Sequence, residues 1–321
     1  MKKKINFKDK FFIGGSKGMV GSAICRSLLN QGYGKKENGG LLFKPNREEL
    51  NLLNFDAVQK WFLINKPSVV ILAAAKVGGI MANQNYPTDF ILNNLKIQTN
   101  VIEAAWRSGA RRLLFLGSSC IYPKYSKQPI KESYLMTGKL EETNENYAIA
   151  KIAGYRMCDA YNKQYNTNYI CLMPTNLYGP NDNYNLKTSH FFPALISKIH
   201  FAKKNKKKFI TIWGDGSPKR EVMYVDDLSD ACEFFLKKKT KHSLINIGSG
   251  QEKTILEYCK FVIKKLKVNL KIKLDKKKPN GTPRKKLDLS LAKKYGWKSR
   301  YSLNKGFDLT YKDYLKNINK K

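Results

Sequence analysis

The sequence predicts an α/β protein with a doubly wound parallel sheet and a smaller α/β lobe toward the C-terminus. Short runs that are apolar throughout alternate with helix-like segments over the first 180 residues. Strands that are apolar at every position are typical of parallel sheets covered on both faces by helices. Beyond that point the alternation becomes irregular, which indicates a second lobe. With 321 residues, 42% of them hydrophobic, the chain is long enough for two domains.

Strands and helices are expected to follow one another through the first part of the chain. The strand candidates are residues 10–15, 39–44, 68–75, 112–119 and 168–180. Helical patterns lie between them, at residues 19–31, 54–66, 93–109 and 146–165. Ligands of such open sheets bind outside the carboxyl ends of the strands.

The second part mixes loops, strands and helices without a regular order. A loop and a helix are expected over residues 181–204, and a strand, a loop, a short strand and a helix over 209–236. Another strand candidate is residues 243–250, and the tail contains a helix, a strand and loops rich in Pro and Gly.

The net charge of +35 raises the possibility of a nucleic-acid-binding protein. Lysines, however, are spread along the whole chain, and no helix-turn-helix, zinc-finger or RNP pattern is present. Six scattered cysteines without a C-x-x-C pair indicate free thiols rather than disulfides or a metal site. No apolar run approaches the ~20 residues of a membrane helix, and the run after the basic start is too short for a signal peptide. We therefore expect a cytoplasmic protein that binds neither nucleic acid nor membrane.

A glycine-rich loop follows the first strand candidate. Gly15, Gly18 and Gly21 form G-x-x-G-x-x-G at the start of a predicted helix. Glycines allow the tight turn and the close approach of a pyrophosphate, which the helix N-terminus attracts. The alternative is a tight turn without a ligand, but the strand before and the helix after favour a Rossmann-type dinucleotide site.

Basic residues stand where an NAD site usually has an acid. The second strand ends in "FKPNREE", which brings Lys44 and Arg47 before any carboxylate, and Lys17 lies inside the glycine loop. Cations at these places favour a 2′-phosphate, and therefore NADP(H). The alternative is that they are ordinary surface charges of a very basic protein.

Tyr147 and Lys151 are four residues apart on a predicted helix and therefore share one face. We expect the ammonium of Lys151 to lower the pKa of the phenol, so that the phenol exchanges a proton with a sugar oxygen near neutral pH. A Tyr-x-x-x-Lys pair is common on ordinary helices. Its position after a Ser-rich strand end and behind the glycine loop gives it weight.

The chain resembles the extended short-chain dehydrogenase/reductase family, in the branch that acts on nucleotide sugars. Most of its length carries the resemblance, through "GMVGSAI", "AAAKVGGIMAN", "LLFLGSSCIYPK", "NENYAIAKIAG", "MPTNLYGPNDN", "SHFFPALI" and "PNGTPRKKLD". The most similar branch converts GDP-4-keto-6-deoxy-D-mannose to GDP-L-fucose by 3,5-epimerisation and NADPH-dependent 4-keto reduction. The resemblance implies that Tyr147 donates the proton for reduction, that Lys151 assists it, and that Ser118 lies near the transferred group.

Cys120 is unusual at such a strand end, because a simple ketoreductase needs only Ser, Tyr and Lys. The hydrogens next to a 4-keto group are acidic, and their inversion requires a base on one face of the ring and an acid on the other. A thiolate held by nearby positive charge can be the base. The resemblance assigns Cys120 as the base and His190 as the acid; the alternatives are a buried structural thiol and a surface histidine at a helix start.

The resemblance also implies two sets of binding residues. The cofactor is expected on Gly15, Ser16, Lys17, Gly18, Met19, Val20, Gly21, Arg47, Leu116, Gly117, Ser118, Ser119, Tyr147, Lys151, Pro174, Thr175, Asn176, Leu177 and His190. The nucleotide sugar is expected on Lys198, Trp213, Arg220 and Asn280. Two of these depart from the family pattern, which commonly has Arg at position 198 and Asp at position 280.

Residues 1–178 are expected to form the NADP-binding domain, to which the chain returns near residues 222–248. Residues 179–321 are expected to form mainly the substrate-binding lobe. By analogy with relatives, the two long helices predict a homodimer. Alternative functions are a related 4-ketoreductase or epimerase without the double inversion and, less favoured, a nucleic-acid-binding protein.

Overall fold

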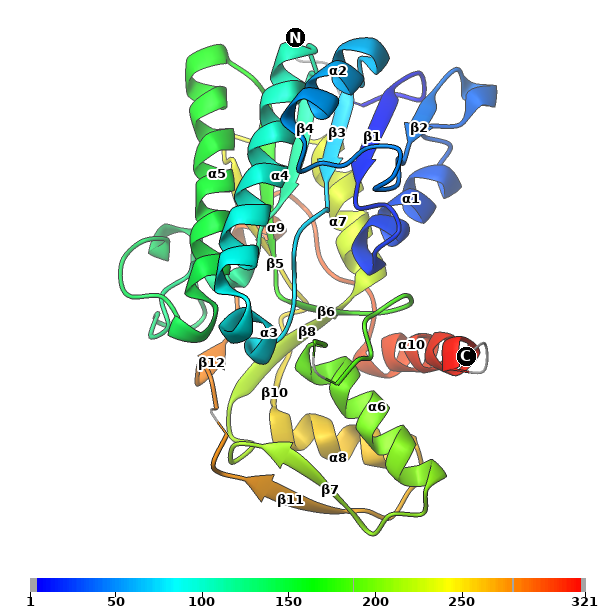
Figure 1. Cartoon of the computed structure of the whole chain (residues 1–321), viewed down its shortest axis with the longest axis vertical. Coiled ribbons are helices and arrows are strands. Elements are labelled where there is room, and N and C mark those ends of the chain that lie inside the picture. Colours follow the sequence, from blue (N-terminus) through cyan, green and yellow to red (C-terminus); the bar gives the residue numbers. More distant parts are fainter. Residues whose placement is uncertain (1–4, 187, 279, 319–321) are drawn as a thin grey trace.

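Six parallel strands form the main sheet, in the order β2-β1-β3-β4-β5-β9. They are β1 (Lys10–Gly14), β2 (Leu41–Phe43), β3 (Val69–Leu72), β4 (Arg112–Leu116), β5 (Tyr169–Pro174) and β9 (Leu244–Ile247). The computed structural model describes residues 5–186, 188–278 and 280–318, so the basic residues at the very start of the chain lie outside it. The predicted parallel, doubly wound sheet is confirmed, and its strand order reverses direction between β1 and β3 (Figure 1).

Helices cover both faces of this sheet. One face carries α2 (Phe55–Asn65), α4 (Pro87–Arg107) and α5 (Glu145–Tyr165), and α4 and α5 run side by side (Figure 1). The other face carries α1 (Met19–Asn30), α7 (Val225–Lys237) and α9 (Ser290–Lys294). Side chains of each strand alternate between the two cores: Phe11 and Ile13 face α1 and α7, whereas Phe12 faces α2. Both faces are thus apolar, which is why the strands read as continuous apolar runs.

The second lobe has its own small sheets and its own core. Strand β8 (Lys219–Tyr224) is flanked by β10 (Glu252–Thr254), β12 (Arg284–Lys285) and β6 (Asn176–Tyr178). A two-stranded sheet pairs β7 (Phe209–Trp213) with β11 (Lys271–Asp275). The lobe's helices are α6 (Phe191–Lys204), α8 (Ile255–Lys265) and α10 (Leu303–Ile318). Their buried side chains form a third apolar core, in which Phe192, Ile196 and Tyr258 are central.

Two sequence expectations are corrected by the structure. The single strand expected over residues 168–180 is two strands: the N–H of Thr175 still donates to the Ile247 carbonyl of β9 at 3.0 Å, whereas from Asn176 on the chain pairs with β8. The helix expected from residue 93 begins at Pro87, a residue suited to a first helical position. It follows a short helix, α3 (Ile80–Asn85), that the pattern did not indicate. The described ranges also contain short 3-10 helices: η1 (Lys36–Asn38), η2 (Ser119–Ile121), η3 (Glu132–Tyr134) and η4 (Glu142–Asn144).

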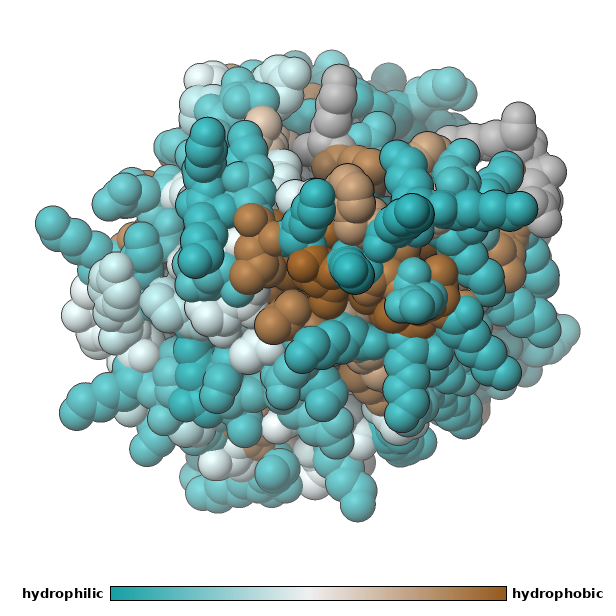
Figure 2. Space-filling model, turned by 90° about the horizontal axis from the view of Figure 1, so that it is seen from below, coloured by the Kyte–Doolittle hydropathy of each residue, from teal (hydrophilic) through white to brown (hydrophobic). Residues whose placement is uncertain are grey.

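Seen from below, the end of the molecule that belongs to the second lobe shows an apolar area surrounded by hydrophilic side chains (Figure 2). A groove of about 500 Å³ lies between α8 and β11 and is lined by Leu256, Ile263, Leu270, Ile272 and Leu274, with Lys260 and Lys264. Within the described ranges, no helix has both the length and the apolar character that crossing a bilayer would require.

Candidate active site

The glycine loop closes tightly onto the start of α1. Gly15 has a φ of +82°, which other residues rarely adopt. A Cβ on Gly21 would come within 2.1 Å of the Gly15 carbonyl oxygen, so only glycine lets the helix approach the loop this closely. Gly18 caps the helix without a side-chain hydrogen bond. Backbone N–H groups at the helix N-terminus thus face outward, as a bound pyrophosphate requires.

The predicted cations lie at the same edge of the sheet. Ser16 donates to the carbonyl of Lys44 at 3.3 Å, which joins the glycine loop to the end of β2. Lys17, Lys44 and Arg47 are all exposed. Flexible exposed cations beside a glycine loop provide charge for a 2′-phosphate, whereas no acid stands at the end of β2 itself.

The neighbouring carboxyl ends of β4 and β5 carry most of the other residues expected at the cofactor. Leu116 is the last residue of β4, Gly117, Ser118 and Ser119 follow it, and Gly117 N donates to the Leu172 carbonyl at 3.0 Å. Pro174, Thr175, Asn176 and Leu177 lie where the chain crosses from β5 to β6. Met19 and Val20 belong to the first turn of α1. The structure therefore brings these segments to one edge of the sheet.

Ser118, Tyr147 and Lys151 meet between β4 and α5. A hydrogen bond joins the Tyr147 phenol to Ser118. The Lys151 side chain is only 3% exposed, and its ammonium donates to the Leu116 carbonyl at 2.9 Å. It also lies 5.8 Å from the centre of the Tyr147 ring. The predicted helical face thus delivers both side chains to the strand end that carries Ser118.

The pKa of Tyr147 differs from the sequence expectation. Burial raises it, the charge interaction with Cys120 raises it further, and the hydrogen bond from Ser118 lowers it only partly. Burial lowers the pKa of Lys151 to about 8. The expected lowering of the phenol's pKa is therefore wrong for the protein alone: desolvation dominates, and the ammonium is engaged by a backbone carbonyl. The phenol keeps its proton at neutral pH.

Cys120 lies in η2, directly after β4, and polar groups surround its sulfur. The side-chain amide of Asn144 donates to Sγ at 3.3 Å, and the ammonium of Lys285 donates to it at 3.7 Å. Charge interactions also connect the thiol with Tyr147 and Arg220. Cys120 is partly exposed, whereas the other five cysteines are buried. Cys120 is therefore the accessible thiol, and it is not sealed among apolar neighbours.

His190 is the N-cap residue of α6; part of the residue is exposed, while neighbouring protein groups surround its ring. Desolvation by the surrounding protein lowers the pKa of its ring, and the charge of Lys285 lowers it further. The two candidate epimerisation groups thus share a neighbour, since Lys285 contacts Cys120 and acts on His190. The other two histidines have structural partners, Tyr311 for His200 and Tyr295 for His242.

Trp213 marks the part of the site expected to hold the nucleotide. It is 39% exposed, and the ammonium groups of Lys198 and Lys278 lie 5.7 and 5.6 Å from its ring centre. Burial lowers the pKa of Lys198, which also donates to the Thr211 carbonyl at 3.4 Å. Asn280 accepts from Asp215 N at 3.0 Å and so closes the turn after Trp213. Of the two positions that depart from the family pattern, Lys198 lies over the Trp213 ring and Asn280 bonds the backbone of the turn that follows Trp213.

Arg220 connects this region with the thiol. It belongs to β8, and a charge interaction links it to Cys120 and to the buried carboxylate of Glu141. Its guanidinium donates to the Lys219 carbonyl at 2.8 Å. The sequence predicted Arg220 but not Lys285 and Asn144, the two donors to Cys120. The sequence signal for Lys285 and Asn144 was only that their stretches, "PRKK" and "ETNENY", lie next to motifs already predicted to belong to the site.

A parallel Rossmann sheet, a glycine loop and a Ser-Tyr-Lys group define a dinucleotide-dependent enzyme of the short-chain dehydrogenase type. The chain belongs to the NAD dependent epimerase/dehydratase family, whose model matches residues 11–248.

Several relatives cover nearly the whole chain. GDP-L-fucose synthase 1 of Arabidopsis thaliana is 50% identical over 309 residues, which are 96% of this chain and 94% of that protein. GDP-L-fucose synthase of Escherichia coli K12 is 44% identical over 319 residues, 97% of this chain and 98% of that protein. Among solved structures, MlghC, a GDP-mannoheptose C4 reductase from Campylobacter jejuni with NADP bound, is 33% identical. Its TM-score is 0.85, with 97% of this chain and 99% of that chain covered.

Proposed function

We propose that this chain converts GDP-4-keto-6-deoxy-D-mannose to GDP-L-fucose with NADPH, by inversion at C3 and C5 followed by reduction at C4. The observation that carries the proposal is the accessible thiol of Cys120 beside Tyr147, in a chain 44–50% identical to GDP-L-fucose synthases over nearly its full length. A reductase without epimerisation has no need of a reactive thiol at this position.

Inversion uses Cys120 and His190 on opposite faces of the sugar. The Cys120 thiolate takes the proton from C3, the electron pair moves into an enolate, and the oxygen at C4 accepts a hydrogen bond from Tyr147. His190 then returns a proton to the other face of the same carbon. Cys120 passes its proton to solvent, His190 regains one, and the sequence repeats at C5.

Reduction uses the protonated phenol of Tyr147. NADPH, when bound, supplies a hydride for C4. The phenol holds its proton at neutral pH and gives it to the oxygen at C4, while Ser118 orients that oxygen by a hydrogen bond. Lys151 assists because its ammonium, held by the Leu116 carbonyl, favours the phenolate that remains.

The residues around the glycine loop fit NADPH. The glycine loop closes on helix α1 at Gly21, where a Cβ would have no room. No side chain caps the start of α1, so its N-terminus is suited to the pyrophosphate. Lys17 and Arg47 would hold the 2′-phosphate. The bound NADP of the Campylobacter jejuni reductase, 33% identical, supports this choice of cofactor.

The second lobe would bind the GDP portion of the substrate. Trp213 offers an exposed indole face for the base or sugar, and Lys198 and Arg220 offer positive charge for the diphosphate. Asn280 holds the turn behind Trp213. This division of labour is also the basis for assigning residues 1–178, with the return near 222–248, to the cofactor and residues 179–321 mainly to the sugar.

We further propose a cytoplasmic homodimer that pairs through α4 and α5. Leu92 on α4 and Ile149 and Tyr165 on α5 are each more than 40% exposed. Apolar residues on two adjacent long helices provide a surface for the same helices of a second copy.

The experiment that tests the function is product identification. Purified protein is incubated with NADPH and GDP-4-keto-6-deoxy-D-mannose, and the sugar is identified by NMR spectroscopy. GDP-L-fucose with one NADPH consumed per sugar is expected. A 4-reduced sugar with the D-manno configuration retained at C3 and C5 would favour the alternative of a reductase without inversion, the activity class named for the Campylobacter jejuni relative.

A further inference from the structure

Lys285 lies on the short strand β12, which pairs in parallel with β8. The register places Lys285 opposite Arg220 and Arg284 opposite Lys219. Paired residues of neighbouring strands point to the same face, and successive residues point to opposite faces. Lys285 and Arg220 therefore share the face toward Cys120, whereas Arg284 points away and binds Glu252.

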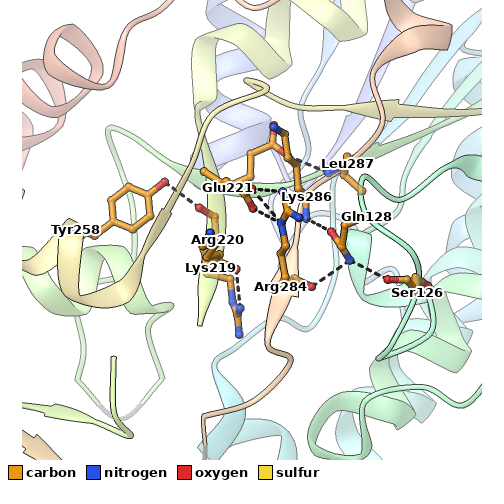
Figure 3. Close-up of polar contacts among 10 residues, drawn as sticks. Ser126, Gln128, Lys219, Arg220, Glu221, Tyr258, Arg284, Lys286 and Leu287 are labelled. Atoms are coloured by element: carbon orange, nitrogen blue, oxygen red, sulfur yellow. Dashed lines mark hydrogen bonds and ion pairs between the residues drawn. The ribbon is translucent and has the colours of Figure 1, made fainter. Parts of the chain in front are cut away.

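The backbone on both sides of Lys285 is held firmly. The side-chain amide of Gln128 donates to the Arg284 carbonyl at 3.3 Å and accepts from Lys286 N at 2.9 Å (Figure 3). The fully buried carboxylate of Glu221 accepts from Leu287 N at 3.1 Å (Figure 3). These bonds hold the backbone at Arg284, Lys286 and Leu287, on both sides of Lys285, while the Lys285 ammonium contacts the sulfur of Cys120.

The sulfur of Cys120 receives two N–H donors, the amide of Asn144 and the ammonium of Lys285. Sulfur in a neutral thiol is a weak acceptor, and the negative charge of a thiolate makes it a much better one. Among the residues that the structure describes, no carboxylate lies within ion-pair distance of the Lys285 ammonium. The polar contact of this ammonium is the sulfur.

We propose that Lys285 is a positioning residue that holds Cys120 as the thiolate needed for proton removal. It acts through the sulfur by charge and by an N–H···S hydrogen bond, and it is placed for this by the register of β12 against β8. The proposal rests on the function proposed above, but its test requires no sugar.

Other titratable groups lie near Cys120 as well. Tyr147 approaches from α5 and Arg220 from β8, and His190, just before α6, interacts with the charge of Lys285. The charge of Arg220 is partly balanced by Glu141, and Tyr147 is neutral in the physiological range. Lys285 is therefore the cation that contacts the sulfur and is not neutralised by a carboxylate. Its removal takes this positive charge away from the sulfur.

The test is the pH profile of alkylation by iodoacetamide, in which the thiolate displaces iodide. Cys120 is the accessible cysteine, and Cys120→Ser provides the blank. For Lys285→Met, the reaction at a fixed pH below the midpoint of the rate profile is expected to be roughly tenfold slower, and the midpoint to lie at higher pH, because the thiolate loses the ammonium that contacts it. Above the midpoint the two proteins should react at equal rates, because both thiols are ionised. This convergence separates a charge effect from a change in access.

Two further variants complete the test. Lys285→Arg keeps the charge and should keep the wild-type profile. Lys286→Met removes the adjacent charge, which acts on Glu221 and Glu252 instead, and should also leave the profile unchanged. An unshifted midpoint in Lys285→Met would overturn the proposal, as would a rate that differs by the same factor at every pH. A shifted midpoint in an enzyme that does not turn over the ketosugar would support the role of Lys285 and refute the proposed function.

Discussion

Replacement of Lys151 by Met is expected to make the protein more stable while removing its reductase activity. Lys151 is 3% exposed, and burial lowers its pKa to about 8 from about 10.5. The pKa of Lys151 is thus about 2.5 units lower in the folded chain than in the unfolded chain. This difference corresponds to ~3.4 kcal/mol of destabilisation at a pH where both states carry the proton. The hydrogen bond to Leu116, lost in the variant, offsets ~1.5–3 kcal/mol of the gain. A net stabilisation of ~1 kcal/mol remains, or a Tm higher by roughly 1–2 °C for a chain of 321 residues.

The stability difference between the two proteins should also depend on pH in a definite direction. Below pH 8 both the folded and the unfolded wild-type chains carry the proton, and the full penalty is present. Between pH 8 and 10.5 the unfolded chain binds the proton more strongly than the folded one, so wild-type stability rises with pH. The advantage of Lys151→Met should therefore be largest at pH 7 and shrink toward pH 10.5. Thermal unfolding of both proteins from pH 7 to pH 10, without cofactor, measures it. A variant that is less stable at every pH would refute the reasoning that burial of this charge is costly.

Two other replacements test the hydride side of the site and the cofactor cradle. Tyr147→Phe removes the proton donor for reduction and also a hydrogen-bond donor to the enolate oxygen, so it should lower the rate of reduction about 10²–10⁴-fold and slow the entry of solvent hydrogen at C3 and C5 as well; an unchanged rate of reduction would contradict the role of the phenol. Gly21→Ala places a methyl group 2.1 Å from the Gly15 oxygen and should weaken NADPH binding by ~1–3 kcal/mol, measured by fluorescence titration. Gly18→Ala is the matched comparison, because its Cβ would meet the same oxygen at an ordinary 3.5 Å and should cost clearly less. Equal affinities of the two glycine variants would show that the close approach is unimportant.

The main sheet could be predicted from the sequence because each of its strands is recognisable from its own run of apolar residues. Strands buried on both faces must be apolar at every position, and Phe11, Phe12 and Ile13 are each fully buried. The glycine loop was predictable for a similar reason, since Gly15 and Gly21 meet within seven residues. The division between β5 and β6 was not, because it follows from a change of pairing partner: Asn176 pairs with Val222 of β8, 46 residues away.

The candidate site was predictable where spacing along one helix or strand end determines proximity. Tyr147 and Lys151 are one helical turn apart, and Ser118 precedes Cys120 by two residues. Lys285 is 165 residues from Cys120, and only the pairing of β12 with β8 joins them. The pKa of Tyr147 was predicted with the wrong sign because the sequence shows a neighbouring ammonium but not the burial that outweighs it.

The most direct test of the proposed chemistry is deuterium incorporation from heavy water into the 4-ketosugar, with NADPH left out. The wild-type protein should exchange hydrogen at both C3 and C5, since Cys120 and His190 act before reduction. Cys120→Ser should slow this exchange by at least two orders of magnitude yet still reduce a ketosugar that is already inverted at both carbons. Wild-type exchange that is undiminished in Cys120→Ser, or absent from the wild-type protein, would contradict the assignment of this thiol as the base.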